Sequence, residues 1–255
     1  MTRPLVLVTR AREQADGLAR ELVAAGLEPV IVPTIAIEFD PPDGELDRRV
    51  RSIGSYRWVV TSSANGVRAV VAASRRVGME PSGTSWAVIG PATRRVLKAE
   101  GIAIDFQPSQ VAARVLGAEL PIEPQDRVLV IRGDLADQEL VFRLRARGAE
   151  VDQVIAYRTR EAPEGSRRLL GEAMTRGPIA AVTFTSGSTV RGLVALGRVE
   201  SIDVLAIPSI CIGLETADEA RAAGFGILAI SATPESAALA ATAAMALAAH
   251  SEVTS

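Results

Sequence analysis

Small hydroxyl residues and glycines stand where short apolar strands end and helices should begin. Backbone N–H groups at a helix start, with the helix dipole behind them, bind carboxylate or phosphate without a cationic side chain. Capping explains any single Ser or Thr at such a place, but the same chemistry at matching positions of two repeats favours a bound polyanion. The candidate anion-binding residues are Thr9, Ser62, Ser63, Gly90, Thr93, Ser186, Gly187, Gly213 and Thr216.

Arginines near the same strand ends could add cationic contacts. Arg10 and Arg132, the latter followed by Gly133, are expected directly after their strands, where a guanidinium can reach an anionic ligand. Arg68 and Arg191 fall one turn into their helices, where a solvated helix face is the usual explanation. Further basic residues nearby are Arg12, Arg94 and Arg158.

Tyr157 is the candidate catalytic residue, and Tyr56 is the other tyrosine. A phenol can donate a proton or a hydrogen bond to a leaving oxygen. The alternative is a strand aromatic that packs across its ladder, as β-propensity favours. Spacing alone favours this second interpretation.

Composition excludes several classes of site. The single cysteine, Cys211, rules out an internal disulfide and a multi-thiolate metal site. The single histidine, His250, is expected in a polar tail, which rules out a His-based triad and a multi-His metal site. A net charge of −2 suggests neither nucleic acid nor an anionic membrane. No apolar run approaches the roughly 18 residues of a membrane span, so a soluble, cytoplasmic protein is expected.

An internal repeat sets the architecture. The stretch "VLVTRAREQADGLARELVAAGLEPVIV" from Val6 matches "VLVIRGDLADQELVFRLRARGAEVDQV" from Val128, 122 residues later. Each copy predicts a strand, an amphipathic helix, a glycine that ends the helix in the left-handed conformation (Gly26 or Gly148), and a second strand. Two further blocks repeat in the same order, from Trp58 and Ala181 and from Val88 and Cys211.

Alternating strands and helices of this kind predict α/β domains, each with an open, parallel, doubly wound sheet of the flavodoxin-like or Rossmann-like type. A G-x-G-x-x-G turn is missing after the first strand, which argues against an ordinary dinucleotide fold. The stretches "TIAIEF" and "VIAYRT" each leave a β-α-β unit and predict a two-stranded ladder that links two globular bodies.

The predicted boundaries follow from that ladder. One domain comprises residues 1–34 plus 161–255 and the other residues 38–156, with linker strands at about 34–39 and 154–160. A ligand cleft is expected between the two domains, beyond the carboxyl ends of their strands. The alternative is two sequential domains of about 125 residues each.

These blocks together resemble the uroporphyrinogen-III synthase family. The resemblance is carried by "VLVTR", "WVVTSSANGVRA", "VIGPAT", "VLVIRGD…GAEVDQVIAYRT", "FTSGS" and "CIGLET", which follow the family's order over nearly the whole chain. It implies a fold of two α/β domains joined by a two-stranded ladder, with the N-terminal β-α-β swapped into the domain that the C-terminal half completes.

The resemblance also implies a lyase without a cofactor. Its substrate would be hydroxymethylbilane, a linear tetrapyrrole with eight carboxylates, which is cyclised with inversion of ring D in haem, sirohaem or cobalamin biosynthesis. Tyr157 matches the family tyrosine proposed to aid departure of the hydroxyl. Thr93, Ser186 and Thr216 match loop residues that line the site, and Ser63 is placed similarly. A monomer is expected, with transfer of the bilane from the upstream deaminase and without nucleic-acid or membrane partners.

Two departures from the family pattern leave an alternative open. Asp134 and Asp137 stand where the family usually has a basic pair, and Ala64 replaces a proline. Acidic groups are unfavourable at an anion site unless they point away or pair with arginines. The alternatives are therefore a diverged, non-catalytic sensor of a tetrapyrrole or another anion, and an unrelated binder of a small phosphorylated or carboxylated ligand.

Overall fold

The computed structural model describes residues 3–253, with side chains described for residues 3–250. Within this range the chain forms two compact units, one of residues up to 36 and from 160 onward, the other of residues 37–159. Mostly parallel sheets flanked by helices make up both, so the predicted α/β class is confirmed. None of the helices within residues 3–253 is long and apolar enough to cross a membrane.

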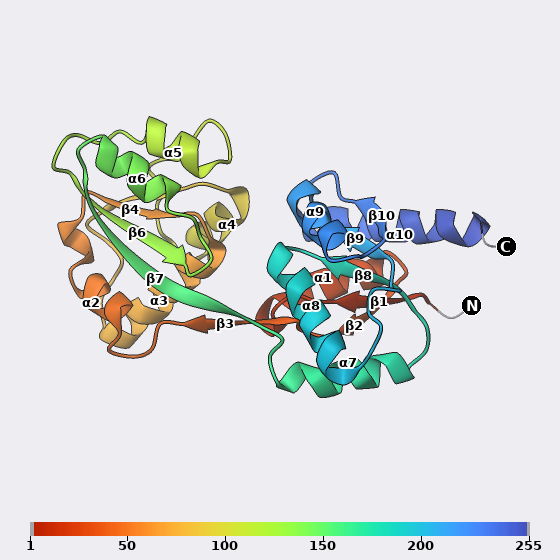
Figure 1. Ribbon diagram of the computed structural model, residues 1–255. Coiled ribbons are helices and arrows are strands. Elements are labelled where there is room, and N and C mark those ends of the chain that lie inside the picture. The colour runs from red at the N-terminus through yellow and green to blue at the C-terminus, as the bar shows by residue number, and fades with distance from the viewer. Residues whose placement is uncertain (1–2, 254–255) are drawn as a thin grey trace. The chain divides into compact units, whose positions relative to one another are not determined.

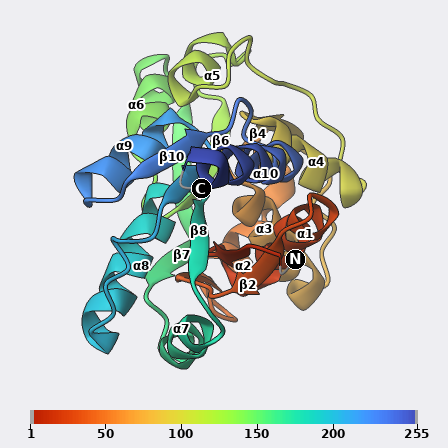
Figure 2. The same ribbon diagram turned by 90° about the vertical axis from the view of Figure 1, so that its right-hand side faces the viewer.

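The first unit has a five-stranded parallel sheet in the order β10-β9-β8-β1-β2. Helices α1 and α10 pack on one face of this sheet, and α7, α8 and α9 pack on the other (Figures 1 and 2). Its elements are β1 (Leu5–Val8), α1 (Arg12–Ala24), β2 (Glu28–Ile31), α7 (Gly165–Thr175), β8 (Ile179–Phe184), α8 (Gly187–Glu200), β9 (Ser209–Cys211), α9 (Leu214–Ala222), β10 (Ile227–Ile230) and α10 (Ser236–Val253).

The second unit has the sheet order β3-β7-β6-β4-β5, in which β3 is Ile35–Phe39 and β7 is Glu150–Glu161. Helices α2, α3 and α4 cover one face, and α5 and α6 cover the other (Figure 1). Its elements are α2 (Glu45–Arg51), a short 3-10 turn η1 (Ile53–Ser55), β4 (Trp58–Thr61), α3 (Ala64–Val77), β5 (Ser85–Val88), α4 (Pro91–Ala99), α5 (Ala113–Glu119), β6 (Arg127–Gly133) and α6 (Glu139–Ala146).

The repeat is visible in the sheet orders. Strands β2-β1-β8-β9 of the first unit correspond to β7-β6-β4-β5 of the second, and a bridge from Phe106 to Ala87 takes the place of β10. Counted within the repeat, the order is 2-1-3-4-5, as in flavodoxin-like sheets. The ligand-binding edge of such a sheet lies at its carboxyl ends beside the switch point, here β1/β8 and β6/β4.

Two further strands carry the chain from one unit to the other. These are β3 (Ile35–Phe39) and β7 (Glu150–Glu161), and β7 is one strand of 12 residues rather than a strand followed by a separate linker. The Asp40 N–H donates to the Ala156 carbonyl and the Ala162 N–H to the Thr34 carbonyl, at 3.0 and 2.8 Å, so the two segments run antiparallel.

Local patterns explain most of these elements. The central strands β1, β4 and β6 are apolar runs rich in β-branched residues and are buried on both faces. Gly26 and Gly148 end their helices with φ of +82° and +89°, which confirms the left-handed conformation predicted for them. The tail predicted to start at His250 begins inside a helix, because α10 includes this exposed residue. Earlier in α10, Leu239, Ala243 and Leu247 recur every four residues and are buried against the sheet.

Candidate functional site

A cavity of about 970 Å³ lies beyond the carboxyl ends of β8, β9 and β10 in the first unit. Three strand-to-helix junctions form its walls, leading into α8, α9 and α10. This is the edge at which open α/β sheets bind ligands. Four of the predicted residues line it, namely Ser186, Gly187, Gly213 and Thr216.

The helix starts around this cavity differ in their caps. At α8, Ser186 and Thr189 form a reciprocal capping box, so the hydroxyl of Ser186 is committed to its own helix. At α9, the N-cap is Gly213, and no side chain within residues 3–250 caps the helix. The first N–H groups of a helix have no partners within it. Those of α9 are therefore open to an anion in the cavity.

The second unit repeats this contrast. Ser63 caps α3 by accepting a hydrogen bond from the Asn65 N–H at 3.1 Å. Gly90 precedes α4, which begins with Pro91 and has no cap from a side chain in the described part of the protein. The capping explanation thus holds for the two serines, whereas the two glycines leave helix starts open at equivalent places of the repeat.

Exposed apolar side chains lie next to these open helix starts. Leu214, the first residue of α9, is 69% exposed, and Val111 is 70% exposed. A Cβ placed on Gly90 would lie 3.6 Å from Cγ1 of Val111, so that side chain is beside the start of α4. Neither residue was predicted from the sequence. Leu214 could have been found, because it is an apolar residue directly after the glycine that precedes a helix. The combination suits a ligand that is both anionic and apolar.

Tyr157 lies on β7 beside the end of β6. Its hydroxyl donates to Oγ of Ser63 at 2.8 Å, which brings two predicted residues together. Gly133 is its partner in the strand register. A Cβ on Gly133 would lie 2.6 Å from Cζ of Tyr157, closer than real Cβ contacts, so the ring can occupy this place only against a glycine.

The surroundings of Tyr157 favour the neutral phenol. Burial raises the pKa of Tyr157 above its ordinary value of 10.0, the hydrogen bond with Ser63 opposes that rise, and the negative charge of Asp134 adds to it. Asp134 also holds β7 directly after the tyrosine: its N–H donates to the Tyr157 carbonyl at 3.2 Å, and its Oδ1 accepts from the Thr159 N–H at 3.1 Å.

Arg132 has a different place from the predicted one. It belongs to β6 instead of following it, because the strand continues to Gly133, and it is only 8% exposed. Its guanidinium donates to the carbonyls of Gly133 and Ala136 and to the Gln153 side chain. Arg132 therefore fastens the loop that carries Asp134. Arg10 is half-buried and donates to Ser236 and Gln14.

The other predicted residues are spread between interior and surface. Thr9 is fully buried, with its hydroxyl donating to the Thr183 carbonyl at 2.6 Å, and Thr93 is 2% exposed. Ser62 is exposed at the end of β4. Arg191 is held between Glu161 and Glu219, at 2.8 and 2.9 Å. The structure thus gathers one group around the cavity of the first unit and a second around Tyr157.

Known proteins resemble this chain over most of its length. A porphyrin biosynthesis protein HemD from Ruminiclostridium josui is 29% identical over 87% of this chain and 45% of its own length, so this chain spans about half of that relative. A uroporphyrinogen-III synthase from Synechococcus elongatus is 31% identical over 75% of this chain and 74% of its own length.

A solved structure shares the fold. It is a mutant uroporphyrinogen III synthase from the extremely thermophilic bacterium Thermus thermophilus, with a TM-score of 0.64, 21% identity, and coverage of 96% of this chain and 99% of that one. The family model described as uroporphyrinogen-III synthase HemD matches residues 16–241. The chain therefore belongs to the uroporphyrinogen-III synthase family.

Proposed function

We propose that this protein is a uroporphyrinogen-III synthase, which cyclises hydroxymethylbilane with inversion of ring D. The observation that carries the proposal is the repeated pairing of an uncapped helix start with an exposed apolar side chain, at Gly213 and Leu214 in one unit and at Gly90 and Val111 in the other. Family membership supplies the reaction. It removes the interpretation as an unrelated binder, and the relatives named above do not favour a regulatory module.

The proposed substrate fits this chemistry. A bilane carries carboxylates around four apolar pyrrole rings, so it needs hydrogen-bond donors and apolar contacts at the same place. The open N–H groups of α4 and α9 can hold carboxylates through the helix dipole. Leu214 and Val111 can pack against the rings. Of the predicted residues, Gly90 and Gly213 are therefore proposed to bind substrate directly, and Ser63 and Ser186 to fix the loops beside them.

Tyr157 is proposed to assist loss of the terminal hydroxyl. In this step the bond from the methylene carbon to oxygen breaks, and the hydroxyl takes up one proton and leaves as water. The electron pair of the pyrrole nitrogen forms the new double bond, and the nitrogen gives up its N–H proton, so the products are a neutral azafulvene and one water. A phenol that stays neutral can hydrogen-bond to the departing oxygen while charge develops on it. The hydroxyl of Tyr157 now donates to Ser63 and would exchange that partner for the substrate.

The arrangement of the chain suits control of substrate shape. We propose two flavodoxin-like domains linked by β3 and β7, with the boundaries 1–34 plus 161–255 and 38–156. The division of the chain into compact units inside β3 and β7 supports this proposal. Holding a flexible bilane in one folded conformation converts an unselective closure into a selective one, because the reacting carbons are positioned in advance.

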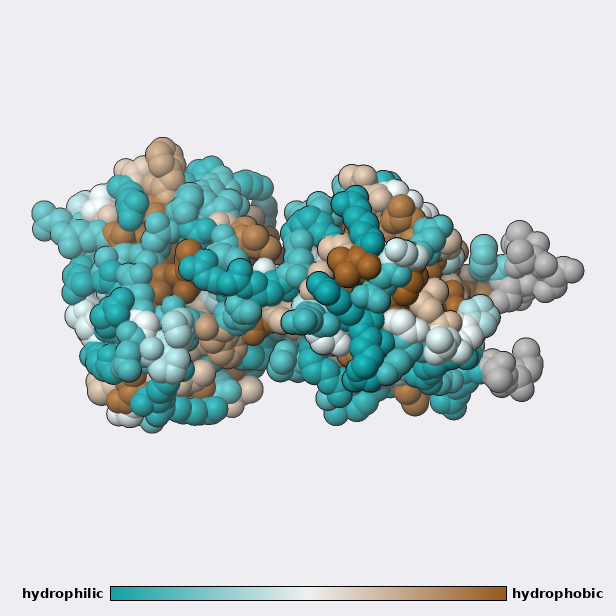
Figure 3. Space-filling view, turned by 60° about the horizontal axis from the view of Figure 1, so that its bottom comes forward, coloured by the Kyte–Doolittle hydropathy of each residue, from teal (hydrophilic) through white to brown (hydrophobic). Residues whose placement is uncertain are grey.

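The proposed cellular setting has three parts. We propose a monomer that acts in the cytoplasm and receives the bilane from the deaminase that forms it. The face shown in Figure 3 is mostly hydrophilic, with apolar side chains in small separate groups, which supports a monomer. Light scattering of the purified protein, alone and mixed with the deaminase, tests the monomer and the transfer complex.

The decisive experiment supplies freshly generated hydroxymethylbilane and resolves the type I and type III isomers of the product. The proposal expects type III product well above the uncatalysed background. Only type I product would overturn the enzyme assignment in favour of a tetrapyrrole-binding module.

A Tyr157→Phe variant tests the residue assigned to the chemical step. We expect its rate of type III formation to fall about 10²-fold, the lower end of the range for a positioned proton donor. Tyr56→Phe is the matched control, since Tyr56 bonds to Asp152 at the opposite, amino-terminal end of the same sheet. An unchanged rate in Tyr157→Phe would remove this phenol from the mechanism.

A further inference from the structure

A second cavity, of about 740 Å³, lies in the unit of residues 37–159, at the amino-terminal end of β5. It is formed by the end of α3, the loop of residues 78–84 and the segment after α4. Gly90 follows the other end of β5, so this cavity is at the sheet edge opposite to the proposed substrate site. Its volume is within the range of small-molecule sites.

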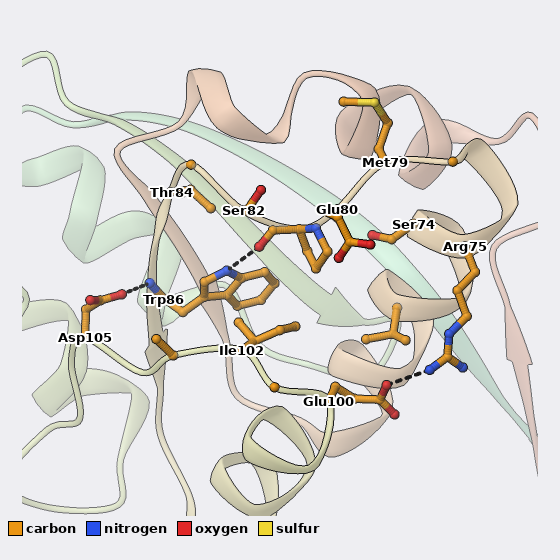
Figure 4. A pocket seen from close by; sticks show the side chains of 16 residues that line it. Ser74, Arg75, Met79, Glu80, Ser82, Thr84, Trp86, Glu100, Ile102 and Asp105 are labelled. Atoms are coloured by element: carbon orange, nitrogen blue, oxygen red, sulfur yellow. Dashed lines mark hydrogen bonds and ion pairs between the residues drawn. The ribbon is translucent and has the colours of Figure 1, made fainter.

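Trp86 and the loop over it shape this cavity (Figure 4). The indole N–H of Trp86 donates to the Pro81 carbonyl at 3.2 Å, and Asp105 accepts from the Trp86 backbone N–H at 2.8 Å. Gly78 and Gly83 take left-handed φ values of +68° and +76°, which let the loop turn twice. The hydrogen bond from Trp86 to Pro81 thus ties the loop to the start of β5.

Two hydroxyl groups in the cavity have unsatisfied hydrogen-bonding capacity. Oγ of Ser74 and Oγ1 of Thr84 are buried atoms with no hydrogen-bond partner among the described residues, and Ser74 is only 4% exposed. Both residues line the cavity and lie on different sides of it in Figure 4. Buried polar groups without partners are rare and call for an explanation. A ligand that donates a hydrogen bond at the cavity wall would give one of these hydroxyls its missing partner.

The charges around the cavity select the class of ligand. Its lining residues include the carboxylates of Glu80, Glu100 and Asp105 and the guanidinium of Arg75. Arg75 is paired with Glu100 at 2.7 Å and Asp105 is bound to Trp86, while Glu80 has no ion pair among the described residues. Such a lining disfavours an anion such as the bilane and favours a group that donates hydrogen bonds and carries positive charge.

We propose that this cavity is a binding site for a small primary amine with an apolar body. Its ammonium group would pair with Glu80 and donate to the hydroxyls of Ser74 or Thr84. The apolar body would lie against Val71, Ile102 and Ala103. This inference does not rest on the proposed enzymatic function.

Titration of the isotope-labelled protein with 2-phenylethylamine tests the proposal, with 2-phenylethanol and 3-phenylpropionate as neutral and anionic comparators of similar size. We expect saturable binding of the amine with a Kd on the order of 1 mM, within reach of so small a ligand. Chemical-shift changes should centre on the amides of Ser74 and Thr84 and on the indole N–H of Trp86. The anion should bind at least about fivefold more weakly than the amine.

Two variants locate the binding. Ser74→Ala should weaken amine binding about fivefold, the effect of one hydrogen bond. This variant should fold, because Ser74 lies in α3 and alanine favours a helix. Ala103→Trp should abolish binding by filling the cavity. Ser52→Ala, another serine of the same unit but outside the cavity, should leave the Kd unchanged. Absence of saturable binding, shifts centred elsewhere, or equal binding of the anion would overturn the proposal.

Discussion

At the scale of single residues, Asp134 is an acidic residue whose contacts hold strand β7 in place. An acidic residue beside an anion site would repel the substrate. Here its carboxylate accepts the Thr159 N–H, and its own N–H binds the Tyr157 carbonyl. Asp134 thus fixes the strand at Tyr157, and its charge helps to keep that phenol neutral.

Asp134→Asn separates these two effects. Asn can still accept the Thr159 N–H, but the negative charge that raises the pKa of Tyr157 is lost, so this pKa should fall while burial keeps it above 10.0. Tyrosinate absorbance against pH measures it, and Tyr157→Phe identifies which of the two transitions belongs to Tyr157. If a neutral phenol is required, the alkaline limb of activity should move to lower pH in the same variant.

Asp137→Asn is the matched control for this titration. The Asp137 carboxylate accepts the Glu139 N–H at 2.9 Å, and its charge is not among those that shift the pKa of Tyr157. We expect the pKa of Tyr157 to be unchanged in Asp137→Asn. A pKa of Tyr157 that rises in Asp134→Asn would show that the charge of Asp134 does not act on the phenol.

Gly133 should be needed for the position of the Tyr157 ring. In Gly133→Ala the new Cβ would be 2.6 Å from Cζ of Tyr157, so the ring must shift and its hydrogen bond to Ser63 is lost. We expect type III formation to fall about 10²-fold, as for other misplaced catalytic groups. Gly165→Ala, where nothing lies within 4 Å, should have full activity. Full activity of Gly133→Ala would show that this position of the ring is not required.

At the scale of elements, helix α8 packs directly on the turn between β2 and β3. The hydroxyl of Thr34 donates to the Thr189 carbonyl at 2.8 Å, and a Cβ on Gly192 would lie 2.1 Å from the Thr34 carbonyl oxygen. At the equivalent position of the repeat, α3 has Ala69. The close approach therefore belongs to the first unit alone.

Gly192→Ala should accordingly lower the free energy of unfolding by about 3 kcal/mol, because the backbone of Thr34 cannot yield as a flexible side chain would. Gly171→Ala in α7 has nothing within 4 Å and should raise it by about 0.5–1 kcal/mol through helix propensity. Urea unfolding measures both. Equal stabilities of the two variants would contradict the packing described for α8.

The elements that could be predicted depend on local pattern. The alternation of strands and helices and the left-handed glycines Gly26 and Gly148 follow from periodicity and from steric rules that act within a few residues. The contact of Tyr157 with Ser63 joins residues 94 positions apart and depends on the register that places Gly133 beside Tyr157. The commitment of Arg132 to its own loop likewise depends on how far β6 extends, which periodicity does not fix.

At the scale of the whole molecule, the repeat supplies two similar sheet edges with open helix starts, and only one of these edges has a phenol, that of Tyr157. Tyr157 is matched by Ile35 in the other copy, 122 residues earlier. Open helix starts occur in both units, whereas the group assigned to the chemical step occurs in one. Substrate binding should therefore be sensitive to changes in both units, and the chemical step mainly to changes around Tyr157.

Charge substitutions at Leu214 and Val111 test whether both units contribute to substrate binding. Leu214→Asp and Val111→Asp would each place a carboxylate beside a helix start that is proposed to hold a substrate carboxylate. Aspartate is favourable in the first turn of α9, so Leu214→Asp should fold. Each variant should raise KM for the bilane about tenfold with little change in kcat, and the double variant about 100-fold if the two sites act independently.

Leu214→Asn and Val111→Asn, which are polar but uncharged, control for lost apolar contact and should raise KM less. An effect confined to one of the two aspartates would mean that a single unit holds the carboxylates, even if type III product is still formed.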